Sequence, residues 1–132
     1  MTPSTDMQPV FGRCGTVIAW ISDDVLFDLC GRWVAFFDDE GVYSFRGKLL
    51  GFYEGGWFRD QRGDALGFTE DADDQGPVRP VCDPVPYPPA MDFPPIPATP
   101  HVFPVSPMPG VDWSLSTWSD FIAGSGNVCS MY

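Results

Sequence analysis

Positive charge is scarce in this chain. Its 132 residues contain 7 Lys and Arg against 18 Asp and Glu, so the formal net charge is −11. Nucleic acids and anionic membranes are bound chiefly through cations that neutralise phosphate groups. The composition therefore argues against both partners and favours a soluble protein or one with a cationic partner.

Long apolar runs and a leader sequence are also lacking. No run approaches the roughly 18 apolar residues that a membrane-spanning helix needs, so no membrane insertion is expected. The N-terminal MTPSTDMQPVFGRCG has no basic stretch followed by an apolar one, so no signal peptide is predicted. We expect a cytoplasmic protein or, alternatively, part of a virion. The cysteines show no C-x-x-C spacing and are expected to be free thiols: Cys14, Cys30, Cys82 and Cys129.

Catalytic patterns are missing as well. The single histidine, His101, lies among prolines, whereas a nucleophile and its base need a rigid support. No G-x-S-x-G pattern, glycine-rich phosphate loop or zinc-ligand spacing is present. We therefore expect no enzyme, no catalytic residue and no cofactor.

Glycine, in contrast, is abundant and periodic. Four glycines are spaced by sixteen residues, and an aromatic residue follows each of them five positions later: Gly15, Gly31, Gly47 and Gly63, with Trp20, Phe36, Phe52 and Phe68. Three of the four glycines are preceded at three positions by Asp or Ser, which is typical of a type I turn. The turns lie between short runs of β-branched and aromatic residues, which favour strands.

This period predicts an all-β domain over residues 8–70, built from four β-hairpin repeats of sixteen residues around a pseudo-fourfold axis. Strand side chains alternate between two faces. We therefore expect the apolar third and fifth positions after each glycine to face the core. The fourth position, always Ala or Gly, is expected to face the other way, against another segment of backbone.

Three features carry a resemblance to a known family: the run VIAWISDDVLFDLCGRWVAFFDDEGVYSFRGKLLGFYEGGWFRDQRGDALGFTE, the Pro-rich segment and the ending WSLSTWSDF. In these features the chain resembles the small bacterial 4-fold beta flower domain proteins. The resemblance covers residues 8–70 and 113–121. It implies a core of four β-hairpin petals around a fourfold axis. It implies no activity, since the family has none assigned, and this tail departs from the Lys- or Arg-rich tails common in the family.

Residues 71–110 form an acidic and then Pro-rich extended segment. Thirteen prolines between Pro77 and Pro109 exclude a helix or a central strand and favour polyproline II. In one interpretation the segment displays motifs such as PVPYPP to aromatic grooves. In the other, which we favour, its apolar side chains cover the small-residue face of the petals, because exposed apolar surface is a liability.

Residues 111–123 form an aromatic motif. TWSD matches a capping box with Thr117 as the cap, and it predicts a helical turn near 118–123 that docks on the domain or on a neighbouring subunit. Residues 124–132 are expected to be frayed.

The hairpin tips opposite the glycine turns are acidic. Carboxylates there could hold Ca²⁺ or a cationic peptide, although no D-x-D-x-D-G loop is present, and solvated turns are the favoured interpretation. These weak metal candidates are Asp23, Asp24, Asp38, Asp39 and Glu40. Cations gather near the glycine turns instead, so we expect a dipolar domain suited to head-to-tail stacking: Arg32, Arg46, Lys48, Arg59 and Arg62.

These patterns favour a non-enzymatic interaction or structural module that acts through protein–protein contacts, with self-assembly into a homo-oligomer through the arm as one form. The alternatives are a small-ligand or metal-binding β domain and a structural component of a phage particle or other large assembly. The candidate interaction residues are Tyr87, Phe93, Phe103, Trp113, Trp118 and Phe121.

Overall fold

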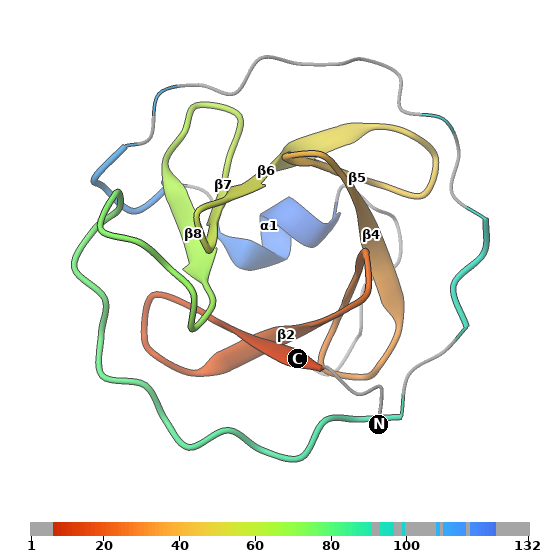
Figure 1. Cartoon of the computed structure of the whole chain (residues 1–132), viewed down its shortest axis with the longest axis horizontal. Coiled ribbons are helices and arrows are strands. Elements are labelled where there is room, and N and C mark those ends of the chain that lie inside the picture. The colour runs from red at the N-terminus through yellow and green to blue at the C-terminus, as the bar shows by residue number, and fades with distance from the viewer. Residues whose placement is uncertain are drawn as a thin grey trace.

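The chain forms a closed antiparallel β-barrel of eight strands (Figure 1). The computed structural model describes residues 7–90, 93–96, 99, 108, 110–115 and 117–123. Its elements are β1 (Gln8–Phe11), β2 (Val17–Ser22), β3 (Val25–Phe27), β4 (Trp33–Asp38), β5 (Gly41–Tyr43), β6 (Leu49–Glu54), β7 (Trp57–Arg59), β8 (Ala65–Phe68) and α1 (Trp118–Ala123). Each strand pairs with the next, and Phe11 pairs with Phe68 to close the ring. The predicted all-β fold of four hairpin repeats is confirmed.

The repeat glycines form the turns that join β1 to β2, β3 to β4, β5 to β6 and β7 to β8. Each glycine N–H donates to the carbonyl three residues earlier at 2.9–3.1 Å, as in a type I turn. The φ angles of these glycines lie between +83° and +95°, a left-handed region that favours glycine. The Oδ1 atoms of Asp28 and Asp60 accept N–H groups two and four residues later. This explains why Asp precedes the glycine by three positions.

The opposite hairpin ends turn in two residues. Ser22 pairs with Val25 across Asp23 and Asp24, and the next tip, at 39–40, has the same geometry. Asp23 has a φ of +55° and Asp39 a φ of +54°, and Asp tolerates this region better than most residues do. Turn geometry therefore accounts for aspartate at these positions.

A β-bulge recurs at the third position after each repeat glycine. In the first unit Val10 pairs with Ala19 and Phe11 with Val17, so Ile18 is skipped. The other three units skip the equivalent residue: Val34, Leu50 and Leu66. A bulge interrupts the alternation of side chains, so the prediction that the third and fifth positions share the core face is wrong.

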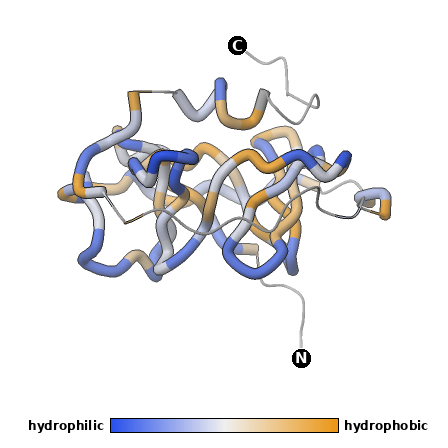
Figure 2. Tube along the Cα trace, turned by 90° about the horizontal axis from the view of Figure 1, so that it is seen from above, coloured by the Kyte–Doolittle hydropathy of each residue, from blue (hydrophilic) through white to orange (hydrophobic). Residues whose placement is uncertain are grey.

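The barrel interior contains the third and fourth positions together. Val34 and Leu50 lie there with the fully buried Ala19 and Ala35. The fifth-position aromatics Phe36 and Phe68 belong instead to two separate clusters. Helix α1 lies inside the ring in Figure 1 and at one end of the barrel in Figure 2. Phe121 and Ile122 extend the central core from this helix.

The small residue at the fourth position after each repeat glycine therefore faces the barrel interior. A methyl group at Gly51 would collide with the carbonyl oxygen of Arg59 and lie 2.7 Å from the Phe121 ring. At the equivalent Gly67 the nearest atom, the carbonyl oxygen of Phe11, would be 3.0 Å away. The small column thus lets a neighbouring strand and α1 approach closely.

We expect Gly51→Ala to lower the free energy of unfolding by about 1–3 kcal/mol, because overpacking a filled core displaces its neighbours. Gly67→Ala is the matched control and should cost less than about 1 kcal/mol. Urea unfolding followed by tryptophan fluorescence measures both. Equal losses would show that α1 does not pack against β6 as described.

The ring of Tyr43 lies against Phe36, with 5.6 Å between centroids. Burial, and after it Asp38 and Asp39, raises the pKa of Tyr43 from 10.0. The folded chain therefore holds the phenol proton more tightly than the unfolded chain does. The resulting stabilisation is present below pH 10.0 and is lost as the pH rises through the raised pKa.

Tyr43→Phe should therefore make the free energy of unfolding fall less steeply above about pH 10. Urea midpoints measured across this range test the expectation. Tyr87→Phe, at a ring that is 97% exposed, serves as the control. An unchanged slope in Tyr43→Phe would contradict the assignment.

Candidate interaction surface

Arg59 stands at a repeat position that is aromatic in the other three units. The residue four positions before each glycine is Phe11, Phe27, Tyr43 and, in the last unit, Arg59. The Arg59 side chain is only 1% exposed, and its guanidinium lies 5.8 Å from the ring centroid of Trp57. Burial lowers the pKa of Arg59, and the nearby Glu54, Asp73, Asp64 and Asp60 oppose that shift.

The Arg59 guanidinium binds three backbone carbonyls. Nη1 donates to the oxygens of Gly63 at 2.6 Å and Gly110 at 2.8 Å, and Nη2 donates to the oxygen of Gln75 at 2.5 Å. Gln75 directly precedes the Pro-rich segment, and Gly110 directly follows it. One side chain therefore fixes both ends of residues 76–109, which we call the arm.

Trp57 holds the departing end of the arm. Its Nε1 donates to the carbonyl of Asp73 at 3.0 Å, and Gly76 packs so closely on the ring that a methyl group there would lie 2.5 Å from it. The N–H of Asp73 donates to the carbonyl of Gly55 at 2.8 Å. The acidic segment is thus bound along β7 before the arm begins.

The returning end of the arm adds a short parallel pairing beside β8. Ala65 donates to the carbonyl of Asp112 at 3.1 Å, and Ser114 donates to the carbonyl of Ala65 at 2.7 Å. The hydroxyl of Ser114 donates to Asp60 Oδ2 at 2.5 Å. This pairing joins the aromatic motif to the last hairpin.

Three of the candidate interaction residues make intramolecular contacts. Trp113 packs on Trp57 with 5.9 Å between ring centroids. Trp118 packs on Phe58 at 5.3 Å and on Phe121 at 5.2 Å. The capping box of α1 forms as predicted, since the N–H of Asp120 donates to Thr117 Oγ1 at 3.0 Å. The motif docks on its own domain.

Tyr87 and Phe93, in contrast, lie on the arm and are each 97% exposed. Figure 1 shows the described part of the arm following the outside of the barrel, and the N–H of Asp83 donates to the carbonyl of Gly15 at 2.8 Å. The expectation that apolar arm side chains cover the small-residue face is wrong for the described residues, because that column lies inside the barrel. Phe103 lies outside the described residues.

The acidic tips do not assemble into a cation site. Asp23 and Asp24 lie on one tip and Asp39 and Glu40 on another. Within residues 7–90 and the other described positions, no three His, Cys, Asp or Glu side chains are arranged to hold a metal ion.

The cysteines depart from the expectation of four free thiols. Cys14 and Cys82 are free and exposed, whereas Cys30 is disulfide-bonded. The expectation rested on the absence of a signal peptide and of C-x-x-C spacing, but a disulfide requires proximity in space and not in sequence. Cys129 lies outside the described residues, as does His101.

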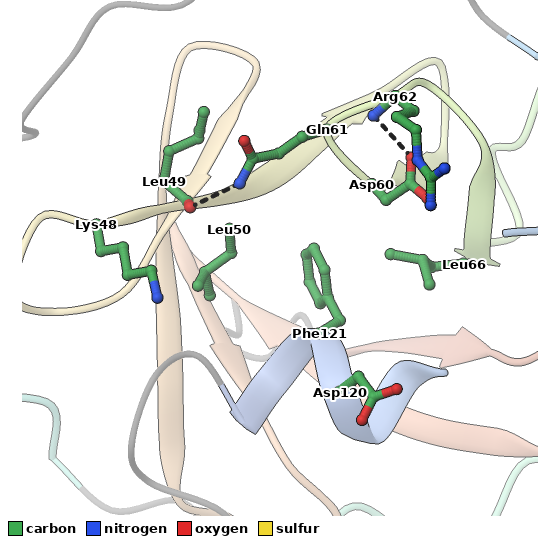
Figure 3. Close-up of a pocket in the computed structure, with 9 residues that line it drawn as sticks. All are labelled: Lys48, Leu49, Leu50, Asp60, Gln61, Arg62, Leu66, Asp120 and Phe121. Atoms are coloured by element: carbon green, nitrogen blue, oxygen red, sulfur yellow. Dashed lines mark hydrogen bonds between the residues drawn. The ribbon is translucent and has the colours of Figure 1, made fainter. Parts of the chain in front are cut away.

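An open pocket of about 300 Å³ lies between α1 and the turn that joins β7 to β8 (Figure 3). Leu50, Leu66 and Phe121 line its apolar side, and Lys48 and Arg62 lie at its margin with Asp60 and Asp120. Gln61 donates to the carbonyl of Leu49 at 3.2 Å. The charges of both signs leave this pocket without a clear preference for an anion or a cation.

The closed barrel and the anchored arm define a petal-type all-β domain that carries an external Pro-rich loop. The chain belongs to the 4-fold beta flower protein family, whose model matches residues 8–122. No curated protein and no solved structure was found to match it. Among the described residues, no helix is long and apolar enough to cross a bilayer.

Arg59→Phe restores the aromatic type of the column and removes the donors that hold the arm. We expect the barrel to retain its circular dichroism spectrum, while backbone hydrogen exchange in residues 72–76 and 110–115 rises tenfold or more. Hydrogen bonds from a charged group contribute about 1.5–3 kcal/mol each, which is enough for such a change.

Arg32→Phe is the control for this experiment, since Arg32 is an exposed turn residue. It should leave exchange in both segments unchanged. Equal protection in the Arg59→Phe and Arg32→Phe variants would contradict the anchoring role of Arg59.

Proposed function

We propose that this chain is a non-enzymatic interaction module that contacts a protein partner through its Pro-rich arm. The observation that carries the proposal is the exposure of large apolar side chains on a segment fixed at both ends. Val81, Tyr87, Phe93 and Ile96 are 93–97% exposed. Several large apolar side chains exposed along one short segment are a liability for a protein that binds nothing, and apolar surface of this kind favours an interaction site.

The anchors also favour binding in energetic terms. A free tail would lose much of its conformational freedom when a partner orders it, and this loss weakens association. Arg59 already restricts the arm by binding the carbonyls of Gln75 and Gly110. The barrel thus acts as a rigid support that displays a partly ordered ligand.

The partner is a protein and not a nucleic acid, since the net charge of −11 repels phosphate. Self-association is a special form of the same function, and a subunit of a larger particle would be another. A small-ligand domain is the alternative that the pocket beside Phe121 supports. The exposed arm supports the interaction module more strongly, because the pocket is open and of mixed charge.

The test replaces residues 78–108 with a Gly/Ser sequence of equal length, so that Gln75 and Gly110 keep their bonds to Arg59. Tagged full-length protein should recover specific partners from an extract of the source cells, and the replaced variant should lose them. The double variant Asp23→Asn, Asp24→Asn should still recover them. Equal recovery with and without the arm, or no recovery, would contradict the proposal.

A further inference from the structure

The exposed apolar residues of the arm recur every three positions. From Val78 to Met108 every third residue is apolar except Thr99: Val78, Val81, Pro84, Tyr87, Ala90, Phe93, Ile96, Thr99, Val102, Val105 and Met108. In a polyproline II helix, which has three residues per turn, residues three positions apart share one face. Only one of the thirteen arm prolines, Pro84, falls in this series.

The large apolar side chains of this series are strongly exposed. The large apolar members of the series that the structure describes are Val78, Val81, Tyr87, Phe93, Ile96 and Met108, at 91%, 93%, 97%, 97%, 95% and 86% exposed. Val85, which is apolar but out of phase, is 46% exposed. Pro77, Pro80 and Pro89 share a different phase and are half-buried, whereas Asp83, Pro86 and Pro95 of that phase are exposed. The half-buried residues within 77–90 thus all fall outside the apolar series, and the large apolar side chains of the series that the structure describes point to solvent.

We propose that this outward face docks into a groove lined with aromatic side chains and bordered by Lys or Arg on a second, different protein. The inference rests on the function proposed above and names the contact face and the partner chemistry. Aromatic grooves recognise polyproline II ligands through side chains that recur with the helix turn. Three turns around Tyr87 would occupy about 28 Å of such a groove, at about 3.1 Å per residue.

Carboxylates near the arm are the reason to expect Lys or Arg beside the partner's groove. Asp71, Asp73 and Asp74 are exposed just before the arm, and Asp83 lies within it. The guanidinium of Arg79 donates to the carbonyl of Ala72 at 2.9 Å and so is engaged within the chain. A second copy would bring a charge of −11 against −11, and this repulsion favours a different, cationic protein.

Site-specific photo-crosslinking tests the face directly. The full chain carries benzoylphenylalanine at one position at a time, in phase at Val81, Tyr87 or Phe93 and out of phase at Cys82, Asp83 or Val85. Each variant is illuminated in an extract of the source cells, at about 50 mM and about 500 mM salt. We expect adducts from the in-phase positions, at least fivefold weaker adducts from the others, and weaker yields at high salt.

Three outcomes would overturn the inference. Equal yields at all six positions would leave the interaction module intact and remove the docking face. An adduct with the mass of two chains would identify a second copy as the occupant. No adduct from any arm position would overturn both this inference and the proposed function.

A matched pair of substitutions provides a second measurement. Unlabelled Val81→Ser and Val85→Ser proteins compete with the crosslinking of the Tyr87 variant. We expect Val81→Ser to compete about tenfold less well than the unsubstituted chain, because the variant lacks the valine side chain that the partner's groove buries. Val85→Ser should compete within about twofold of it, and equal competition by the two variants would overturn the assigned face.

Discussion

A buried guanidinium is stable only where other oxygens replace the water that it has lost. Arg59 obtains three such oxygens, and two of them belong to the segments that begin and end the arm. Trp57 also contacts both segments, through the carbonyl of Asp73 and the ring of Trp113. Arg59 adds direct hydrogen bonds to both segments, so the closure of the arm depends on this arginine together with Trp57.

The need to replace lost water by carbonyl oxygens also explains why the fourth repeat differs from the others. In the other three units the equivalent position carries a buried aromatic side chain, and two of these, Phe11 and Tyr43, pack in apolar clusters. In the fourth unit the chain must leave the barrel and return to it beside β8. The carbonyl groups of Gln75 and Gly110 lie at these two points, and a planar donor with several N–H groups satisfies them better than another ring would.

Much of the barrel could be predicted from the sequence because its turns impose local rules. Asp28 and Gly31 define a turn by hydrogen bonding and by φ, and four copies of such a turn fix the strand order. The faces of the strands could not be predicted by simple alternation. A bulge at residues such as Ile18 shifts the register, and nothing in the residue type of this column marks a bulge.

The candidate interaction surface could be predicted only in part from the sequence. The exposed aromatics Tyr87 and Phe93 could be selected from the Pro-rich composition, and the docked Trp118 and Phe121 from the capping box. The role of Arg59 was missed because it was grouped with surface cations. Its place in an otherwise aromatic column is the signal that could have found it.

The most direct measurement of this account is NMR of the Arg59 guanidinium in the ¹⁵N- and ¹³C-labelled protein. The account predicts separately resolved Nη resonances with slow hydrogen exchange, and scalar couplings across hydrogen bonds to the carbonyl carbons of Gln75 and Gly110. A single averaged Nη signal that exchanges as fast as that of an exposed arginine would contradict it.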